Sequence, residues 1–243
     1  MNLAEEEPKM FLESSRPLLL GHRGAPKLAP ENTLESFEAA LSAGADGVEL
    51  DLQLTFDDEL VVHHDSDVGG RAISELASAE FRALAPHAPT FAQLLDLLAA
   101  WPEAYLNIEL KPAVPRPDGR EVALAKALAG WDAQGKARAW VSSFDPHALL
   151  RLGRLAVGTP LALLAADEVH LELLPCLTVA AVHPHYDLVD EGTMAAWRKA
   201  GLAVFAWTVN DQALAKKLLE LGVSGLIGDE PSKLLAARAG TAP

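Results

Sequence analysis

Short apolar runs alternate along the chain with longer stretches of helical periodicity. In the stretch 32–43, Leu34, Phe37 and Leu41 recur at the spacing of one helix face, and Asn32 or Thr33 is placed to cap the first turn. The apolar runs are bounded by glycine, proline and polar residues, which is typical of strands that end in loops. Strands are predicted at 18–20, 48–55, 60–64, 104–110, 139–142, 161–164, 179–182, 202–209 and 225–227.

The order of these elements predicts the fold class. With the hairpin-like pair 48–55 and 60–64 counted once, about eight strand-led units follow one another, which indicates a parallel sheet covered by helices. Eight units in 243 residues fit a closed TIM (β/α)8 barrel better than an open sheet, and no Gly-x-Gly-x-x-Gly turn follows the first strand. We predict a single-domain α/β barrel over residues 17–243, with only a short insertion after the second strand, after a loose N-terminal arm over residues 1–16.

The amino-acid composition limits which cellular environments and which classes of partner are expected. The net charge is −14 and the hydrophobic content 50%, which favours a well-packed acidic globule and argues against nucleic acid or an anionic membrane as a partner. No secretory leader or stretch of about 20 apolar residues is evident, so we expect a cytoplasmic protein without stable membrane insertion. The chain has one cysteine, Cys176, so it cannot form an internal disulfide. The apolar run around Cys176 predicts a buried, inert thiol. The oligomeric state is left open.

Candidate chemistry gathers at the ends of the predicted strands. Glu49 and Asp51 are two residues apart in one strand, so their carboxylates point to the same face. Such a pair needs a cation between the two groups or a raised pKa in one of them, and a metal ion is the simpler explanation. Solvated edge positions are the alternative, but they would give the strand only one apolar face.

Histidines stand near the same strand ends. His22 follows the first strand within Gly21-His22-Arg23-Gly24. His63 and His64 close the hairpin-like pair, and adjacent strand residues face opposite ways, so only one of these two can join a cluster with His22. In a barrel, the carboxyl ends of the strands meet at the face where active sites lie.

These residues occur in motifs that resemble those of the glycerophosphodiester phosphodiesterase family. The matching motifs keep one order over almost the whole chain, so the resemblance is specific although His-Arg-Gly alone is a weak signal. The motifs are Gly21-His22-Arg23-Gly24, Pro30-Glu31-Asn32-Thr33, Glu49-Leu50-Asp51, Val61-Val62-His63-His64-Asp65, Glu109-Leu110-Lys111, Ser142-Ser143-Phe144-Asp145 and Trp207-Thr208-Val209-Asn210.

The resemblance implies a TIM-type barrel that binds a divalent metal ion and hydrolyses small-molecule glycerophosphodiesters to an alcohol and sn-glycerol 3-phosphate. It implies that the metal is held by Glu49, Asp51 and Glu109. A ligand set of carboxylates alone suits Mg²⁺ or Ca²⁺, with Mn²⁺ also accepted, better than Zn²⁺.

The resemblance also implies roles for the remaining motif residues. His22 and His64 form the acid/base pair, in which we expect His22 to act as the acid and His64 as the base through a cyclic phosphate. Arg23 and Lys111 lie near the phosphate, and Trp207 lines the glycerol end of the pocket. His63 is then expected on the outer face.

The sequence departs from the family pattern at two places. Gly228-Asp229-Glu230-Pro231 stands where the family often has Thr-Asp before the last proline, and residues 66–71 lack the usual Leu-Asp-Arg-type turn. Other interpretations of single residues are a structural ion pair between Lys111 and Glu109, packing for Trp207, and positions on the barrel rim for His183 and His185.

Three other functions compete with the metal-dependent phosphodiesterase. A barrel glycosidase would use Glu49 and Glu109 as its carboxylate pair, but it leaves Asp51 and the two histidines without a role. A barrel that binds phosphorylated ligands without turnover is the second, although no essential group is missing for catalysis. A phosphatidylinositol phospholipase C is the third, and its two-histidine chemistry is close to that expected here.

Overall fold

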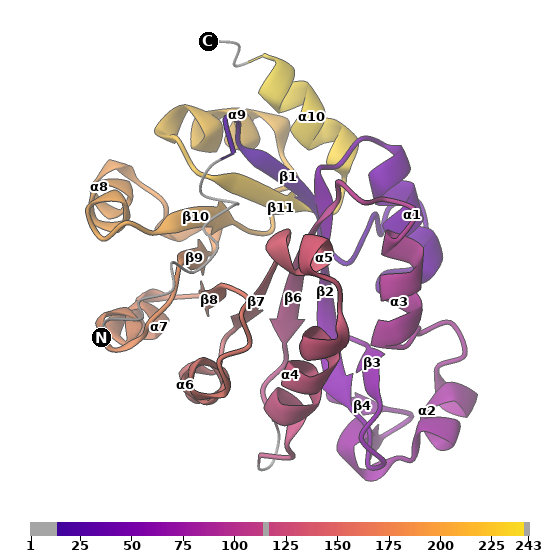
Figure 1. Ribbon diagram of the computed structural model, residues 1–243. Helices are drawn as coiled ribbons and strands as arrows, with labels where there is room; N and C mark the ends of the chain where they lie inside the picture. Colours follow the sequence, from indigo (N-terminus) through magenta and orange to yellow (C-terminus); the bar gives the residue numbers. More distant parts are fainter. Residues whose placement is uncertain (1–13, 114–116, 241–243) are drawn as a thin grey trace.

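The computed structural model describes residues 14–113 and 117–240 and shows a closed barrel of eight parallel strands (Figure 1), which confirms the predicted TIM barrel. The ring is closed by the pairing of β1 with β2. In the order of their pairing, the strands are β1 (Leu18–Gly21), β11 (Gly225–Gly228), β10 (Ala203–Ala206), β9 (Ala181–Pro184), β8 (Leu161–Ala165), β7 (Ala139–Ser143), β6 (Tyr105–Leu110) and β2 (Gly47–Leu54).

Helices surround the strands and cover their outer faces (Figure 1). Thr33 caps the first helix by accepting a hydrogen bond from the backbone N–H of Ser36, as the sequence predicts for this position. The helices of the outer layer are α1 (Leu34–Ser42), α3 (Phe91–Leu98), α4 (Arg120–Gly130), α5 (Ala133–Ala137), α6 (Pro146–Leu155), α7 (Glu168–Glu172), α8 (Glu191–Lys199), α9 (Gln212–Leu221) and α10 (Pro231–Ala239).

The insertion after the second strand is built on a hairpin. Strand β3 (Leu60–Val62) pairs antiparallel with the end of β2, and a small ribbon of β4 (Asp67–Val68) and β5 (Arg71–Ala72) follows. The 3₁₀ turn η2 (Ile73–Glu75) and helix α2 (Ser78–Leu84) complete the insertion, which has its own small apolar cluster. The insertion therefore places residues 63–65, directly after β3, beside the carboxyl end of β2.

Large side chains fill the interior of the barrel below its carboxyl end. The rings of Trp140 and Phe205 are fully buried with their centroids 5.0 Å apart, and His183 packs against both. A TIM barrel is filled by layers of side chains and is not a pore. The site must therefore lie above these rings, toward the ends of the strands.

Several local expectations are wrong. Strand β9 begins two residues later than predicted and includes His183, because its backbone pairs with Leu164 of β8. Short helices α5 and α7 were not predicted, since five residues are too few to show helical periodicity. Cys176 is exposed and not buried: it ends the 3₁₀ turn η3 (Leu174–Cys176), while the apolar residues on either side of it pack on the core.

Residues 1–13 of the predicted N-terminal arm lie outside the described residues, and 14–16 precede β1 without regular structure. No helix in the described ranges is long and apolar enough to cross a membrane.

Candidate active site

A pocket of about 240 Å³ opens among the carboxyl ends of the barrel strands. One wall is apolar and is formed by Phe144, Leu164, Trp207 and Ile227. The other wall and the floor are polar, and they contain seven side chains from four separate segments: His22, Arg23, Glu49, His64, Asn107, Glu109 and Lys111. Predicted site residues that are up to 185 positions apart in the sequence, from His22 to Trp207, therefore line one cavity.

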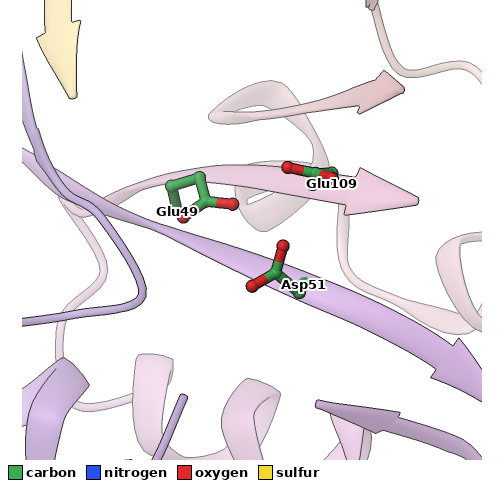
Figure 2. Close-up of side chains that lie close together, drawn as sticks. All are labelled: Glu49, Asp51 and Glu109. Carbon is green, nitrogen blue, oxygen red and sulfur yellow. The ribbon is translucent and has the colours of Figure 1, made fainter. Parts of the chain in front are cut away.

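Three carboxylates meet beside this pocket. Glu49 and Asp51 point to the same side of β2, and Glu109 projects from the adjacent strand β6 (Figure 2). The parallel register places Asp51 directly opposite Glu109. One oxygen of each group lies within 4.8 Å of the others, and all three residues are buried.

Burial and mutual repulsion make ionisation of these acids costly. Burial, together with the negative charge of Asp51, raises the pKa of Glu49 well above its usual range and raises that of Glu109 to about 7. Burial also acts to raise the pKa of Asp51, but the nearby charges of Lys111 and Arg23 outweigh it and hold that pKa below its usual value. The cluster is therefore electrostatically strained, and more positive charge would stabilise its ionised form.

Two cationic side chains supply part of that charge. The ammonium of Lys111 lies 2.7 Å from Oε1 of Glu109 and 3.3 Å from Oδ1 of Asp51. The guanidinium of Arg23 lies 3.1 Å from Oδ2 of Asp51 and also pairs with Glu31. The ion pair between Lys111 and Glu109 expected as a structural alternative is thus present, and Lys111 lines the pocket as well.

The residues fit a hard divalent cation. Oε1 of Glu49 is buried and accepts no hydrogen bond in the described part of the chain, and the buried Oδ1 of Asp51 has the Lys111 ammonium 3.3 Å away but no hydrogen bond from the described residues. Buried carboxylate oxygens are seldom left without a donor, whereas Mg²⁺ and Ca²⁺ take such oxygens as ligands. With all five groups ionised, three negative charges face two positive ones, so a net negative charge is left for a cation to offset.

The tight turn after β1 positions Arg23 against this cluster. Its backbone N–H donates to Oε2 of Glu49 at 2.9 Å. Gly24 follows with φ of +89°, and a side chain there would come within 2.6 Å of the backbone of Ser36. Asn32, whose Nδ2 donates to Oδ2 of Asp51 at 2.8 Å, is a supporting residue that the sequence analysis did not assign to the site.

Both predicted catalytic histidines line the pocket, and each is held by a carboxylate. Nδ1 of His22 lies 2.7 Å from Oδ1 of Asp229, and Nδ1 of His64 lies 2.8 Å from Oδ1 of Asp65. Each ring thereby keeps Nε2 available for a second partner. His63 is not among the lining residues, and its ring packs edge-on against Phe81.

Asp229 is a site residue that sequence reasoning missed. Its Oδ2 accepts a hydrogen bond from Nδ2 of Asn210 at 2.6 Å, and its backbone N–H donates to Oδ1 of the same amide. Burial would raise the pKa of Asp229, but its bonds to His22 and Asn210 hold that pKa below its usual value. The sequence held one signal that could have identified Asp229. It lies directly after the last strand, in the segment Gly228-Asp229-Glu230-Pro231 that departs from the family pattern.

Within the described residues, His183 and His185 belong to no cluster that could hold a metal ion. His183 was expected on the rim but is fully buried in the barrel, where Nε2 accepts a hydrogen bond from Nε1 of Trp140 and burial lowers its pKa to about 3. The ring of His185 lies 5.3 Å from that of Trp207. Trp207 lines the pocket and also packs at right angles to Phe144, and a contact of Trp207 with glycerol stays a prediction.

Comparison with known proteins gives one consistent family. The model of the glycerophosphoryl diester phosphodiesterase family matches residues 22–233. A glycerophosphodiester phosphodiesterase of Caldanaerobacter subterraneus subsp. tengcongensis is 29% identical over 240 residues, which cover 90% of this chain and 97% of that protein. One of Bacillus altitudinis is also 29% identical, with the same coverage.

Solved structures agree in fold. An Oleispira antarctica phosphodiesterase in complex with the product sn-glycerol-3-phosphate is 27% identical with a TM-score of 0.83, over 93% of this chain and 98% of that one. The glycerophosphodiester phosphodiesterase of Thermotoga maritima is 26% identical with a TM-score of 0.76, over 92% and 99% of the two chains. The chain therefore belongs to the glycerophosphoryl diester phosphodiesterase family, and its enzyme class is that of the phosphoric diester hydrolases.

Proposed function

We propose that this protein hydrolyses glycerophosphodiesters to an alcohol and sn-glycerol 3-phosphate, with a divalent cation held by Glu49, Asp51 and Glu109. The observation that supports this most strongly is the convergence of three buried carboxylates and two carboxylate-held imidazoles around one pocket. A glycosidase needs only two carboxylates and leaves the other groups without a role.

The pocket provides for the charge of a phosphodiester. A bound divalent cation would offset the negative charge of the nonbridging oxygens and favour attack at phosphorus. Lys111 and Arg23 already lie at the cluster and would add donors to the same phosphate oxygens. Trp207 and the apolar wall beside it would pack against the carbon atoms of glycerol.

The histidines supply the proton transfers. In the proposed reaction, His64 takes a proton from the glycerol hydroxyl next to the phosphate, and that hydroxyl attacks phosphorus to give a cyclic phosphate. His22 protonates the oxygen of the departing alcohol, and the two roles reverse when water opens the ring. Asp229 and Asp65 bind Nδ1 of the two rings, which fixes their tautomers and orientation.

The direct test of the function is turnover. We expect hydrolysis of glycerophosphocholine, glycerophosphoethanolamine or glycerophosphoglycerol in the presence of Mg²⁺, Ca²⁺ or Mn²⁺, measured as release of glycerol 3-phosphate, and loss of that activity in excess EDTA. Glycoside hydrolysis that survives EDTA would support the competing glycosidase instead. Binding of these diesters without product would indicate a binding protein.

The proton-transfer roles predict a contrast between neighbouring histidines. We expect His22→Gln and His64→Gln each to lower kcat by about 10²- to 10⁴-fold, because each removes one proton transfer. His63→Gln is the matched control, since His63 is adjacent to His64 but does not line the pocket. Equal losses in H63Q and H64Q would contradict the assignment.

Asp229→Asn tests how His22 is positioned. An asparagine whose oxygen still accepts from Asn210 turns its NH₂ group toward Nδ1 of His22, which selects the wrong tautomer. We expect kcat to fall by about 10- to 100-fold with little change in KM. The pH–rate profile should also change shape, which a purely structural role would not produce.

Asp65→Asn, which alters the matching contact of His64, is the comparison for Asp229→Asn. The side chain of Asp65 is 70% exposed and that of Asp229 only 20%, so water can replace the first carboxylate more easily. We expect the smaller loss in D65N. Unchanged kcat in D229N, measured on protein with wild-type thermal stability, would overturn the positioning role.

Glu109→Gln tests the charge balance of the triad. Burial raises the pKa of Glu109 from 4.5 to about 7 in the fold, so the folded state binds this proton more tightly than the unfolded chain does. Without a cation, the wild type should therefore lose stability as pH rises from about 4.5 through about 7. Relative to the wild type, E109Q should gain up to about 3 kcal/mol in free energy of unfolding near pH 8, at about 1.4 kcal/mol per pKa unit.

Denaturant unfolding in EDTA over this pH range measures the difference, and Ca²⁺ provides the control. Added Ca²⁺ should stabilise the wild type at high pH and should stabilise E109Q much less, because one carboxylate ligand is missing. Parallel pH profiles for the two proteins would show that Glu109 does not carry the expected charge penalty.

A further inference from the structure

We propose that Asn107 binds the two free hydroxyl groups of the glycerol moiety and so selects substrates with an unsubstituted vicinal diol. This inference rests on the function proposed above and adds a specificity-determining residue to it: Asn107 would favour diesters whose two glycerol hydroxyls are free over lysophospholipids that carry an acyl chain on the terminal hydroxyl. Three observations support it: the position of Asn107 in the pocket, the absence of a hydrogen-bond partner for its amide among the described residues, and the donor and acceptor that this amide offers.

Asn107 lies at the floor of the pocket. It stands on β6, two residues before Glu109, so both side chains point to the same side of the strand. The parallel register pairs it with Glu49 of β2, one step deeper in the barrel than the pair of Asp51 and Glu109. It is 1% exposed and lines the same cavity as the histidines.

Among residues 14–113 and 117–240, the amide of Asn107 finds no hydrogen-bond partner at either end. Neither Nδ2 nor Oδ1 makes a hydrogen bond within the described part of the chain. Every other polar side chain that lines the pocket has at least one hydrogen-bond partner there. A buried amide with both ends unpaired is costly and rare in folded proteins, which indicates that the occupant of the pocket supplies its partners.

The chemistry of the amide identifies that occupant. An amide offers a donor and an acceptor side by side, which matches two hydroxyl groups on adjacent carbons. Nδ2–H would donate to the oxygen of the hydroxyl next to the phosphate, whose own proton stays directed at a histidine, and Oδ1 would accept from the terminal hydroxyl. A carboxylate, which only accepts, or a lysine, which only donates, could not bind both groups in this way.

An acyl chain on the terminal oxygen would remove this match. The ester has no proton to give to Oδ1, and its chain would have to leave through a buried floor formed by β2 and β6. A site built to hydrogen-bond a hydroxyl rejects analogues that lack it, because its own polar group is then left unpaired.

The experiment measures binding in the presence of Ca²⁺ by calorimetry, with sn-glycerol 3-phosphate and propyl phosphate, which has the same carbon chain and phosphate but no hydroxyl. The wild type should bind glycerol 3-phosphate about 10- to 100-fold more tightly. Asn107→Leu, which has the same branched shape but no polar atom, should reduce this ratio by at least about tenfold and leave the affinities for propyl phosphate and for Ca²⁺ unchanged. Asn107→Ala, which has room in the floor, should reduce it in the same way.

Two further measurements separate recognition from stability. Without ligand, N107L should melt about 2–4 °C above the wild type, because it removes a buried unpaired amide. Thr159→Val is the matched control: Thr159 is also buried with an unpartnered hydroxyl but does not line this pocket, so T159V should keep the wild-type binding ratio.

The possible failures are distinguishable. A wild-type binding ratio in both N107L and N107A would overturn this proposal while hydrolysis of glycerophosphodiesters by the wild type still supported the proposed function. Loss of Ca²⁺ binding in N107L would overturn it in favour of a role as a metal ligand. Absence of both hydrolysis and glycerol 3-phosphate binding in the wild type would overturn the proposed function, and the role of Asn107 with it.

Discussion

The carboxyl end of the barrel is arranged around three buried carboxylates that repel one another, and the groups beside them offset this repulsion. Glu49, Asp51 and Glu109 are brought within 4.8 Å of one another by the parallel register of β2 and β6. Such a cluster is stable only if cations and donors surround it, because an isolated buried charge is expensive. Lys111, Arg23 and Asn32 meet part of that requirement, and the remaining negative charge could be offset by a bound cation.

The backbone hydrogen bonds between β2 and β6 fix the relative positions of the three carboxylates. The three acids stand on central strands of a closed sheet, so their spacing is fixed by backbone hydrogen bonds and not by loops. Below them, Trp140 and Phe205 fill the barrel and exclude water from that side. A ligand of the charged groups therefore has to enter from the open end.

The two imidazoles of the site are held differently from the acids. Each stands just beyond the end of a strand and is oriented by a carboxylate, but the two pairs differ in origin. His64 and Asp65 are neighbours in sequence, whereas His22 and Asp229 are 207 residues apart and meet because β1 and β11 are adjacent in the sheet. The pairing of the first barrel strand with the last thus assembles half of the proposed acid/base pair, which ties that half of the chemistry to the integrity of the whole fold.

The sequence by itself predicted the fold class and most of the residues that the structure brings together at the candidate site. Apolar runs followed by polar motifs predicted the barrel strands to within a few residues, and the spacing of Glu49 and Asp51 identified the acidic centre, because strand periodicity is a local property. Only the tertiary structure decided three further features: the contact of Asp229 with His22, the place of Asn107 in the pocket and the burial of His183. Their environments depend on which strands lie side by side, on register and on the packing of Trp140, and none of these is encoded in local spacing. The same limit explains Cys176: its neighbours are apolar, but only the turn in which it sits decides that its own side chain faces solvent.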